Sequence, residues 1–272
     1  MDYREHAPLP ALAHLVELLW TLDGHADLLR GEAQPVFPDG RCELILHLGD
    51  PFDRIHETGR VERQAAMLFA GQLTSRLVLR PTGRIAIVGV RFHPYGAAAA
   101  VGPPQRDLAG QTIDVASVDP RLGRSLREVQ DRAGSTLDAV ACVQAVLLQH
   151  CADAAPDPRV RHVVAEIERR HGLVSIDRLA QTAGLTRRHL ERQFLRQVGV
   201  PPKRLARIAR FQRALRLLED TPAPRPGAMT AADCGYADQA HFVRDFRDLA
   251  GCAPGAHLLQ RGVLTEFFRR DS

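Results

Sequence analysis

The feature that most constrains the fold is a repeat in the last third of the chain. The segments TRRHLERQF (186–194) and DQAHFVRDF (238–246) agree in residue type at five positions. Each copy opens with a residue suited to capping a helix, Thr186 or Asp238, because its side-chain oxygen can accept a free backbone N–H. The recurrence about fifty residues apart predicts one structural unit built twice.

Helical spacing divides each copy into a buried and an exposed face. The apolar stripes are Leu190, Phe194 and Val198 in the first copy and Phe242, Phe246 and Leu249 in the second. Because a helix advances about 100° per residue, the polar side chains between them point outward. The outward sets are Arg188, Arg192 and Arg196 in the first copy and Gln239, Ala240, Arg244 and Arg247 in the second.

A shorter helical pattern that ends near a glycine precedes each copy. These segments are SIDRLAQTAGL (175–185) and AMTAADCGY (228–236). A helix, a tight turn with glycine and a capped second helix form a helix-turn-helix, whose second helix enters the major groove of DNA. We therefore predict double-stranded DNA as the partner. Arg192 and Arg244, which occupy equivalent positions, suit bidentate contact with guanine.

The second part of the chain carries a net positive charge, as DNA binding requires, and the first part a net negative one. Residues 1–155 hold 15 basic and 19 acidic side chains, whereas residues 156–272 hold 21 and 13. Eleven basic residues and one acid, Glu191, lie between Arg178 and Arg216. Such a stretch is a candidate electrostatic footprint for phosphate, although a solvated helical face gives the same composition.

The helix between the two copies, PPKRLARIARFQRALRLL, begins with prolines suited to a first turn. We expect a core stripe of Leu205, Ile208, Phe211 or Gln212, Leu215 and Leu218. Its arginines recur at every third residue from Arg204 to Arg216, and we interpret most of them as solvated charge, with a few in contact with phosphate.

The segment SIDRLAQTAGLTRRHLERQFLRQVGVPPKRLARIARFQRALRLL, followed by GYADQAHFVRDFRDLAGCAP, resembles the DNA-binding domain of the AraC/XylS transcriptional regulators over about residues 158–258. The resemblance implies two helix-turn-helix units on a linker helix, set into successive major-groove segments. It assigns base reading to Arg188, Glu191 and Arg192 and to Gln239, Ala240, His241 and Arg244. Arg187, Arg196 and Arg247 complete the expected DNA-contact set.

One departure from the family pattern concerns the second unit. The supporting helix usually carries an acid and a β-branched apolar residue just before its alanine, and this chain has Met229 and Thr230 before Ala231. The preceding TPAPRPG is rich in helix breakers. We expect the second unit to be less rigid and to contribute less specificity.

The first half of the chain is β-rich from Gln34 to about Val118, with turn signals at 39–40 and 81–83. In 84–92 both alternating sets are largely apolar, as expected for a strand buried between two layers or closed into a small barrel. Residues 94–104 have room for a short helix, and two helices are predicted, roughly 120–133 and 136–151. The fold class is α+β, with a barrel-like N-terminal domain and an all-α C-terminal domain.

This half is similar to the β-barrel sensor domains that precede the DNA-binding module in many AraC/XylS members, through PDGRCELILHLGDPF, GQLTSRLVLRPTG and VGVRFHPYGAAAAVG. The resemblance implies effector sensing or dimerisation. A pocket of polar groups for a small-molecule effector is expected from Arg41, Glu43, Arg91, His93 and Tyr95. A homodimer and RNA polymerase are further expected partners.

The boundary between the parts falls in ADAAPDP (152–158), which separates the acidic half from the basic one. We predict a sensor domain over 1–152, a linker over 153–158 and a DNA-binding domain over 159–272. The acidic N-terminus does not resemble a secretory signal, and the longest near-apolar run, 139–148, is about half a membrane span. A cytoplasmic protein without membrane contact is expected.

No nucleotide-binding or nucleophile motif is present, and the five cysteines show no C-x-x-C spacing. His47 and His93 lack the spacing of a metal site. We therefore expect neither a cofactor nor a metal, and no enzymatic reaction. The alternative is an enzyme with an unmarked active site in the N-terminal domain and an accessory DNA-binding module. A DNA-repair methyltransferase would need clustered cysteines, and Cys42 alone does not supply them.

Overall fold

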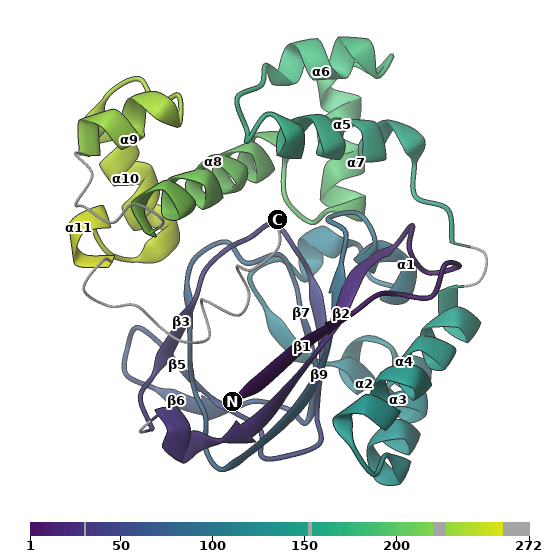
Figure 1. Cartoon of the computed structure of the whole chain (residues 1–272). Coiled ribbons are helices and arrows are strands. Elements are labelled where there is room, and N and C mark those ends of the chain that lie inside the picture. The colour runs from purple at the N-terminus through teal and green to yellow at the C-terminus, as the bar shows by residue number, and fades with distance from the viewer. Residues whose placement is uncertain (30, 152–153, 220–226, 258–272) are drawn as a thin grey trace.

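The computed structural model describes residues 1–29, 31–151, 154–219 and 227–257 (Figure 1). The first part of the chain is β-rich and the second is helical. The strands are β1 (Asp2–His6), β2 (Val16–His25), β3 (Gln34–Val36), β4 (Glu43–His47), β5 (Asp53–Ile55), β6 (Val61–Arg63), β7 (Met67–Ala70), β8 (Leu77–Arg80), β9 (Arg84–Phe92) and β10 (Thr112–Asp114).

The strands form two antiparallel sheets. One has six strands in the order β1-β2-β9-β4-β7-β10, and the other has four in the order β3-β8-β5-β6. Long strands lie at the centre of the larger sheet, where Trp20 of β2 is opposite Gly89 of β9. A Cβ atom on Gly89 would lie 1.9 Å from the Trp20 ring, so only glycine leaves room for this indole.

The predicted β-rich domain is confirmed, and its strands form two facing sheets rather than one closed barrel. The β-structure also begins earlier than predicted, at Asp2 instead of Gln34. The short edge strand β1 is mostly exposed and charged, which hides it from a search for apolar alternation.

Strand β9 explains why both of its faces are apolar. Val88, Val90 and Phe92 belong to a core shared with helices, whereas Ile85 and Ile87 belong to the core with Trp20 between the sheets. The larger sheet is therefore the middle layer of three, which is the first of the two alternatives predicted for 84–92.

The helices on the outer face of the larger sheet follow the strands in the chain. They are α1 (Ala97–Ala100), α2 (Val115–Val118), α3 (Pro120–Arg132) and α4 (Thr136–Cys151), with short 3-10 turns at η1 (Ala26–Leu29) and η2 (Gln105–Asp107). Asp119 caps α3 by accepting from the backbone N–H groups of Arg121 and Leu122. The helices predicted at 94–104, 120–133 and 136–151 are all present.

The second part of the chain is helical throughout its described residues. Its helices are α5 (Pro158–Arg169), α6 (Ile176–Thr182), α7 (Arg187–Gln197), α8 (Pro202–Glu219), α9 (Gly227–Asp233), α10 (Gln239–Ala250) and α11 (Pro254–His257). The helices expected within 175–185 and 228–236, in both copies of the repeat and between the copies are all observed.

The predicted linker, 153–158, begins at a residue outside the described part and ends at the first residue of α5. Asp157 caps this helix through the backbone N–H of Arg159 at 2.9 Å. Most of TPAPRPG and residues 258–272 of the predicted DNA-binding domain also lie outside the described residues. The division into these domains stays a prediction.

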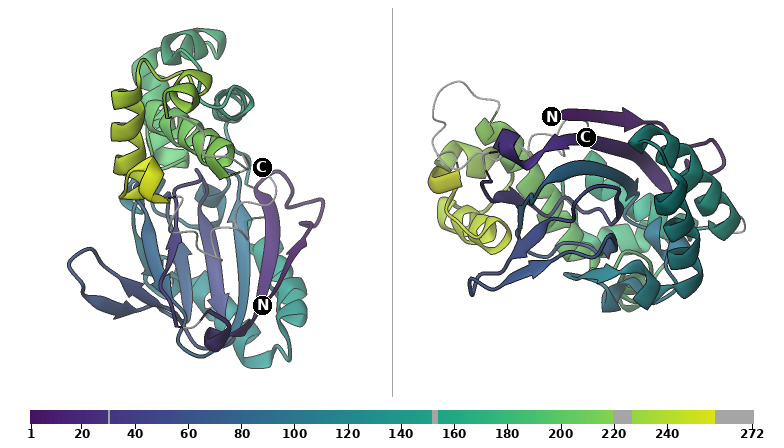
Figure 2. Two further views of the ribbon diagram at one scale, coloured as in Figure 1. Left: turned by 60° about the vertical axis from the view of Figure 1, so that its left-hand side comes forward. Right: turned by 90° about the horizontal axis from the view of Figure 1, so that it is seen from below.

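The helices α5 to α11 gather at one end of the two sheets, as the left view of Figure 2 shows. Helix α8 lies across this end and holds loops of the β-rich part. Arg204 donates to the backbone oxygen of Thr74, and the Gln212 amide donates to that of Pro38 at 2.6 Å. On α5, Glu168 accepts from Arg41 at 2.6 Å.

Candidate nucleic-acid interface and effector pocket

The first helix-turn-helix consists of α6 and α7. Ser175 caps α6, and the Thr186 hydroxyl caps α7 by accepting from the backbone N–H of His189 at 3.2 Å. Gly184, between the helices, has a φ of +66°, a conformation that favours glycine because side chains crowd it. The turn therefore fixes the angle at which α7 leaves α6.

Helix α7 buries Leu190 and Phe194 completely and turns its arginines to solvent. Arg188, Arg192 and Arg196 are exposed and make no ion pair with any residue that the structure describes. Arg187 differs, since it pairs with Glu191 at 3.1 Å and with Asp177 of α6 at 3.3 Å. The predicted contact residues thus divide into three free cations and one internally paired group.

The second helix-turn-helix consists of α9 and α10. The Asp238 carboxylate caps α10 by accepting from the backbone N–H of His241 at 2.6 Å. Gln239, Ala240, Arg244 and Arg247 are exposed, as the repeat predicts. The imidazole of His241 is half-buried and packs edge-on against Tyr236, with 5.3 Å between ring centroids.

Two acidic residues that the sequence analysis passed over attach α10 to the linker helix. Arg207 of α8 donates to Asp245 and to Asp248, both at 2.8 Å. The hydrogen bond from Arg207 holds the pKa of the Asp248 carboxyl below its ordinary value, although burial opposes this effect. Asp245 lies three residues after Phe242, on the buried side of α10, and a charge at such a position requires a partner.

The interpretation of the α8 arginines as mostly solvated charge is wrong for this helix. Arg204, Arg207, Arg210, Arg213 and Arg216 are all half-buried. Arg204 and Arg207 hold acids of α10, and the Arg210 guanidinium lies 5.3 Å from the centre of the Tyr236 ring. A three-residue period on a helix packed against neighbours on several sides places the arginines between them rather than in free solvent.

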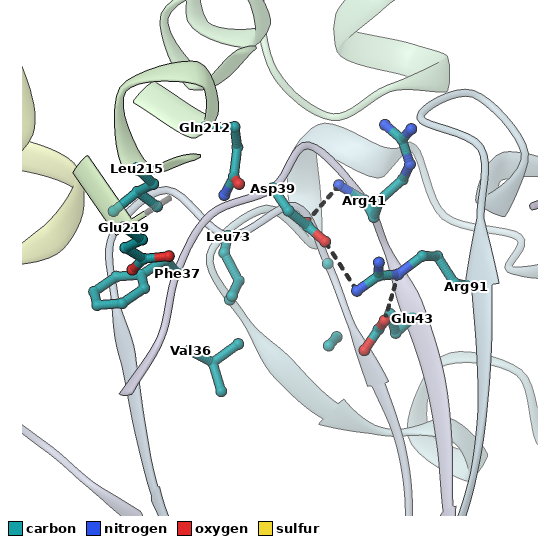
Figure 3. Close-up of a pocket in the computed structure, with 12 residues that line it drawn as sticks. Val36, Phe37, Asp39, Arg41, Glu43, Leu73, Arg91, Gln212, Leu215 and Glu219 are labelled. Atoms are coloured by element: carbon teal, nitrogen blue, oxygen red, sulfur yellow. Dashed lines mark hydrogen bonds and ion pairs between the residues drawn. The ribbon is translucent and has the colours of Figure 1, made fainter. Parts of the chain in front are cut away.

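A cavity lies between α8 and the β-rich part, at the end of the sheets that the helices cover (Figure 3). The space in this cavity that admits the centre of a water molecule amounts to about 60 Å³, within about 620 Å³ of space between atoms that includes open solvent. Its walls are Val36, Phe37, Asp39, Arg41, Glu43, Ala70, Gly71, Leu73 and Arg91 from the β-rich part and Gln212, Leu215 and Glu219 from α8. Both parts of the chain therefore build it.

Three of the five expected pocket residues line this cavity, and each charge is matched. Arg91 pairs with Glu43 at 3.0 Å and with Asp39 at 3.2 Å. Arg41 pairs with Glu17 at 2.5 Å and with Glu168 at 2.6 Å. Burial raises the pKa of Glu43 because it outweighs the attraction of Arg91. For Arg41 and Arg91 the carboxylates outweigh burial, so both guanidinium pKa values are raised.

The other two expected pocket residues do not line this cavity. The ring of His93 stacks on Tyr95 with 5.6 Å between centroids, and its Nε2 lies 3.3 Å from the backbone oxygen of Ala13. Tyr95 lies under the guanidinium of Arg161, 5.9 Å away, and faces the first helix-turn-helix. Strand β9 ends at Phe92, so His93 and Tyr95 lie in the segment that follows it.

Two family models match the chain. The model described as a helix-turn-helix domain matches residues 179–260, and a domain of unknown function, DUF6597, matches residues 4–114. A probable AraC family transcriptional regulator from Rhodopseudomonas palustris is 32% identical over 39% of this chain and 99% of that one, with a TM-score of 0.35. The chain belongs to the AraC/XylS family.

The transcriptional regulator MtrA of Neisseria gonorrhoeae is a further relative within this family, 27% identical over 107 residues. That match covers 39% of this chain and 35% of MtrA, so the chain spans about a third of this curated relative. ToxT of Vibrio cholerae is similar over 96% of this chain and 99% of its own at 10% identity, with a TM-score of 0.45. Another ToxT structure contains an unsaturated fatty acid.

Within the described part of the chain, no helix is long and apolar enough to cross a membrane. Nor do three or more His, Cys, Asp or Glu side chains cluster there in a way that would hold a metal ion.

The sequence analysis did not identify most of the residues that line the cavity between α8 and the β-rich part. Phe37, Leu73 and Leu215 are ordinary apolar residues, and nothing in their spacing indicates that they meet. One signal was available, because two arginines among the apolar strands must be paired when buried. It identified Arg41 and Arg91, but their partner Glu168 comes from the other part of the chain.

Proposed function

We propose that this protein is a sequence-specific DNA-binding transcription regulator that responds to a small-molecule effector. The single observation that carries the proposal is the pair of capped helices, α7 and α10, each packed through a buried stripe that contains phenylalanine, with free arginines outward. Family membership supports regulation rather than catalysis. A protein that acts on DNA in this way would work in the cytoplasm.

Base reading is assigned to outward residues at the start of each recognition helix. Arg188, Glu191 and Arg192 would contact the first half of the site and Gln239, Ala240, His241 and Arg244 the second. Arg192 and Arg244 are exposed and unpaired among the described residues, so each guanidinium is available for a guanine. Arg187, Arg196 and Arg247 would contact phosphates, which makes the affinity fall steeply with salt.

The effector site is assigned to the cavity between α8 and the sheets, with Arg41, Glu43 and Arg91 among its walls. An effector there would touch apolar surface on Phe37, Leu73 and Leu215. ToxT, to which this chain is similar at 12% identity, binds an unsaturated fatty acid in one structure. In this chain, an anionic effector would have to displace a carboxylate from Arg91.

Homodimerisation and contact with RNA polymerase are part of the proposal. The outer face of α3 is charged, whereas that of α4 exposes Leu137, Ala141, Cys142 and Ala145. A helix that is apolar on nearly every side is normally covered. We therefore assign the dimer contact to α4.

The test is a selection of random duplex DNA on the purified protein at physiological salt, followed by sequencing. Enrichment of two boxes about one helical turn apart is expected, because each unit reads one major-groove segment. A Lys203→Ala variant serves as a control, since this lysine lies outside both recognition helices and should leave the selected sequence unchanged. No enrichment with the effector-free protein or with cell extract as an effector source would contradict the proposal.

A further inference from the structure

Phe37, a residue of the β-rich part, lies in the core of the second helix-turn-helix. It follows β3 and is only 8% exposed, and it belongs to the cluster that contains Ile208, Phe211, Phe242 and Phe246. The Phe37 ring packs edge-on against Phe211, with 6.1 Å between centroids, and against His257 at 5.2 Å. These contacts join α8 and α11 to a residue more than 170 positions earlier in the chain.

The backbone that follows Phe37 is held by two side-chain hydrogen bonds. The Gln212 amide of α8 donates to the backbone oxygen of Pro38, and the buried Gln72 amide donates to that of Gly40 at 2.7 Å. Gly40 has a φ of +84°, and a Cβ atom there would lie 2.9 Å from Leu205. The segment 37–40 is therefore clamped between the sheets and the linker helix, and Phe37 has little freedom to leave the core.

Among the described residues, the buried core of the first helix-turn-helix holds no side chain of this kind, although α7 lies beside η2 of the β-rich part. Its core contains Val163, Leu190, Phe194 and residues of α5, α6 and α8, all from the helical part of the chain. Tyr95 and Ala109 of the β-rich part are half-buried and pack against this core from outside. One unit closes its own core, and the other uses a side chain from outside the helical part.

The same segment also lines the proposed effector cavity. Phe37, Asp39 and Arg41 are wall residues, and Leu215 of α8 belongs to both the cavity wall and the core around Phe37. A ligand that displaces this segment must change the packing of Phe37 against α8. The cavity and the second unit therefore share one structural element.

We propose that Phe37 completes the core of the second helix-turn-helix, so that this side chain of the β-rich part controls the stability of α9 and α10 and not that of α6 and α7. This inference rests on the proposed function for its regulatory meaning: occupancy of the cavity would change the contribution of the second DNA box. Phe37 is here a positioning residue, since it acts on DNA binding through α8 and α10.

The experiment compares the full-length wild type with Phe37→Ala by amide hydrogen exchange. Removing a buried aromatic ring leaves a cavity, and exchange in α9 and α10 should become roughly tenfold or more faster, while α6 and α7 keep wild-type rates. Tyr95→Ala is the matched control, because it removes an aromatic ring of the β-rich part that touches the first unit. Phe37→Leu, which keeps apolar volume, should restore most of the protection.

Unchanged protection in α9 and α10 of Phe37→Ala would overturn the inference, as would an equal loss in both units. Should Phe37→Ala fail to fold, Gln212→Ala loosens the same segment without opening the core and should speed exchange in α10 but not in α7. Binding to two-box and one-box DNA then tests the regulatory meaning: the variant should lose the advantage of the second box and keep its affinity for the first. Wild-type protein that selects no DNA would remove the proposed function, yet the exchange result would still decide the role of Phe37.

Discussion

Phe194 of the first helix-turn-helix lies in a core whose buried residues all come from the helical part, whereas Phe246 of the second shares its core with Phe37 from the β-rich part. The two residues are equivalent in the sequence repeat, and both are completely buried. Their surroundings differ because the second unit lies against the end of the sheets where the segment after β3 projects. Repetition of a sequence motif thus gives two similar binding faces on two different supports.

The largest expected effects come from truncating these two equivalent phenylalanines. Phe194→Ala and Phe246→Ala should each cost about 3–5 kcal/mol, because each leaves a cavity in a closed core. Amide exchange should be accelerated around α7 in the first variant and around α10 in the second. If either substitution loosened both units equally, the independence of the two cores would be refuted.

The second largest effect is expected from pH, which should lower the stability of the second helix-turn-helix before that of the first. His47 is buried in the β-rich part, and burial lowers its pKa from 6.5 to about 4, against a smaller opposing effect of Gln64. Between these pH values the unfolded chain binds a proton at His47 that the folded chain does not bind. The free energy of unfolding therefore decreases as pH falls from about 6.5 toward 4, by up to about 3 kcal/mol. Protection in α10 should fall with that of the sheets, and protection in α7 should persist longer.

The control for this pH effect is His47→Gln, which removes the titrating group and keeps a polar side chain. Denaturant unfolding of this variant should show a weaker pH dependence than the wild type over the same window. A slope identical to that of the wild type would assign the acid sensitivity to other groups.

Smaller effects are expected from the equivalent base-reading arginines. Arg192→Ala and Arg244→Ala should each lose about 1–3 kcal/mol of discrimination at one base pair, as measured by competition between the selected site and its single-base variants at fixed salt. The loss should be smaller for Arg244, because its helix depends on the β-rich part for rigidity. Equal weakening on specific and random DNA would instead assign these arginines to phosphate.

The smallest effects concern the helix caps. Thr186→Ala and Asp238→Ala should each cost about 1 kcal/mol in unfolding free energy. The larger loss is expected for Asp238, since a carboxylate 2.6 Å from the His241 N–H also interacts favourably with the positive end of the helix dipole. Thr186→Ser and Asp238→Asn keep a capping oxygen and should recover most of the loss in thermal denaturation.

The helices and outward faces of both units could be read from the sequence, because the apolar stripes and caps are local patterns with fixed spacing. The partners of Asp245 and Asp248 could not, since they come from α8 and depend on how two helices cross. The pocket prediction shows the same limit. Arg41 and Arg91 meet at one cavity, but His93 follows the end of β9 and points elsewhere.

By itself, the sequence determined the repeated helix-turn-helix, its basic outer faces and the burial of both faces of β9, because each depends on the spacing of residues along one element. Only the tertiary structure decided that both parts of the chain build the cavity and that Phe37 lies in the core of the second helix-turn-helix. These features join residues far apart in the chain, and the free energy of burying them depends on surfaces that meet only after folding.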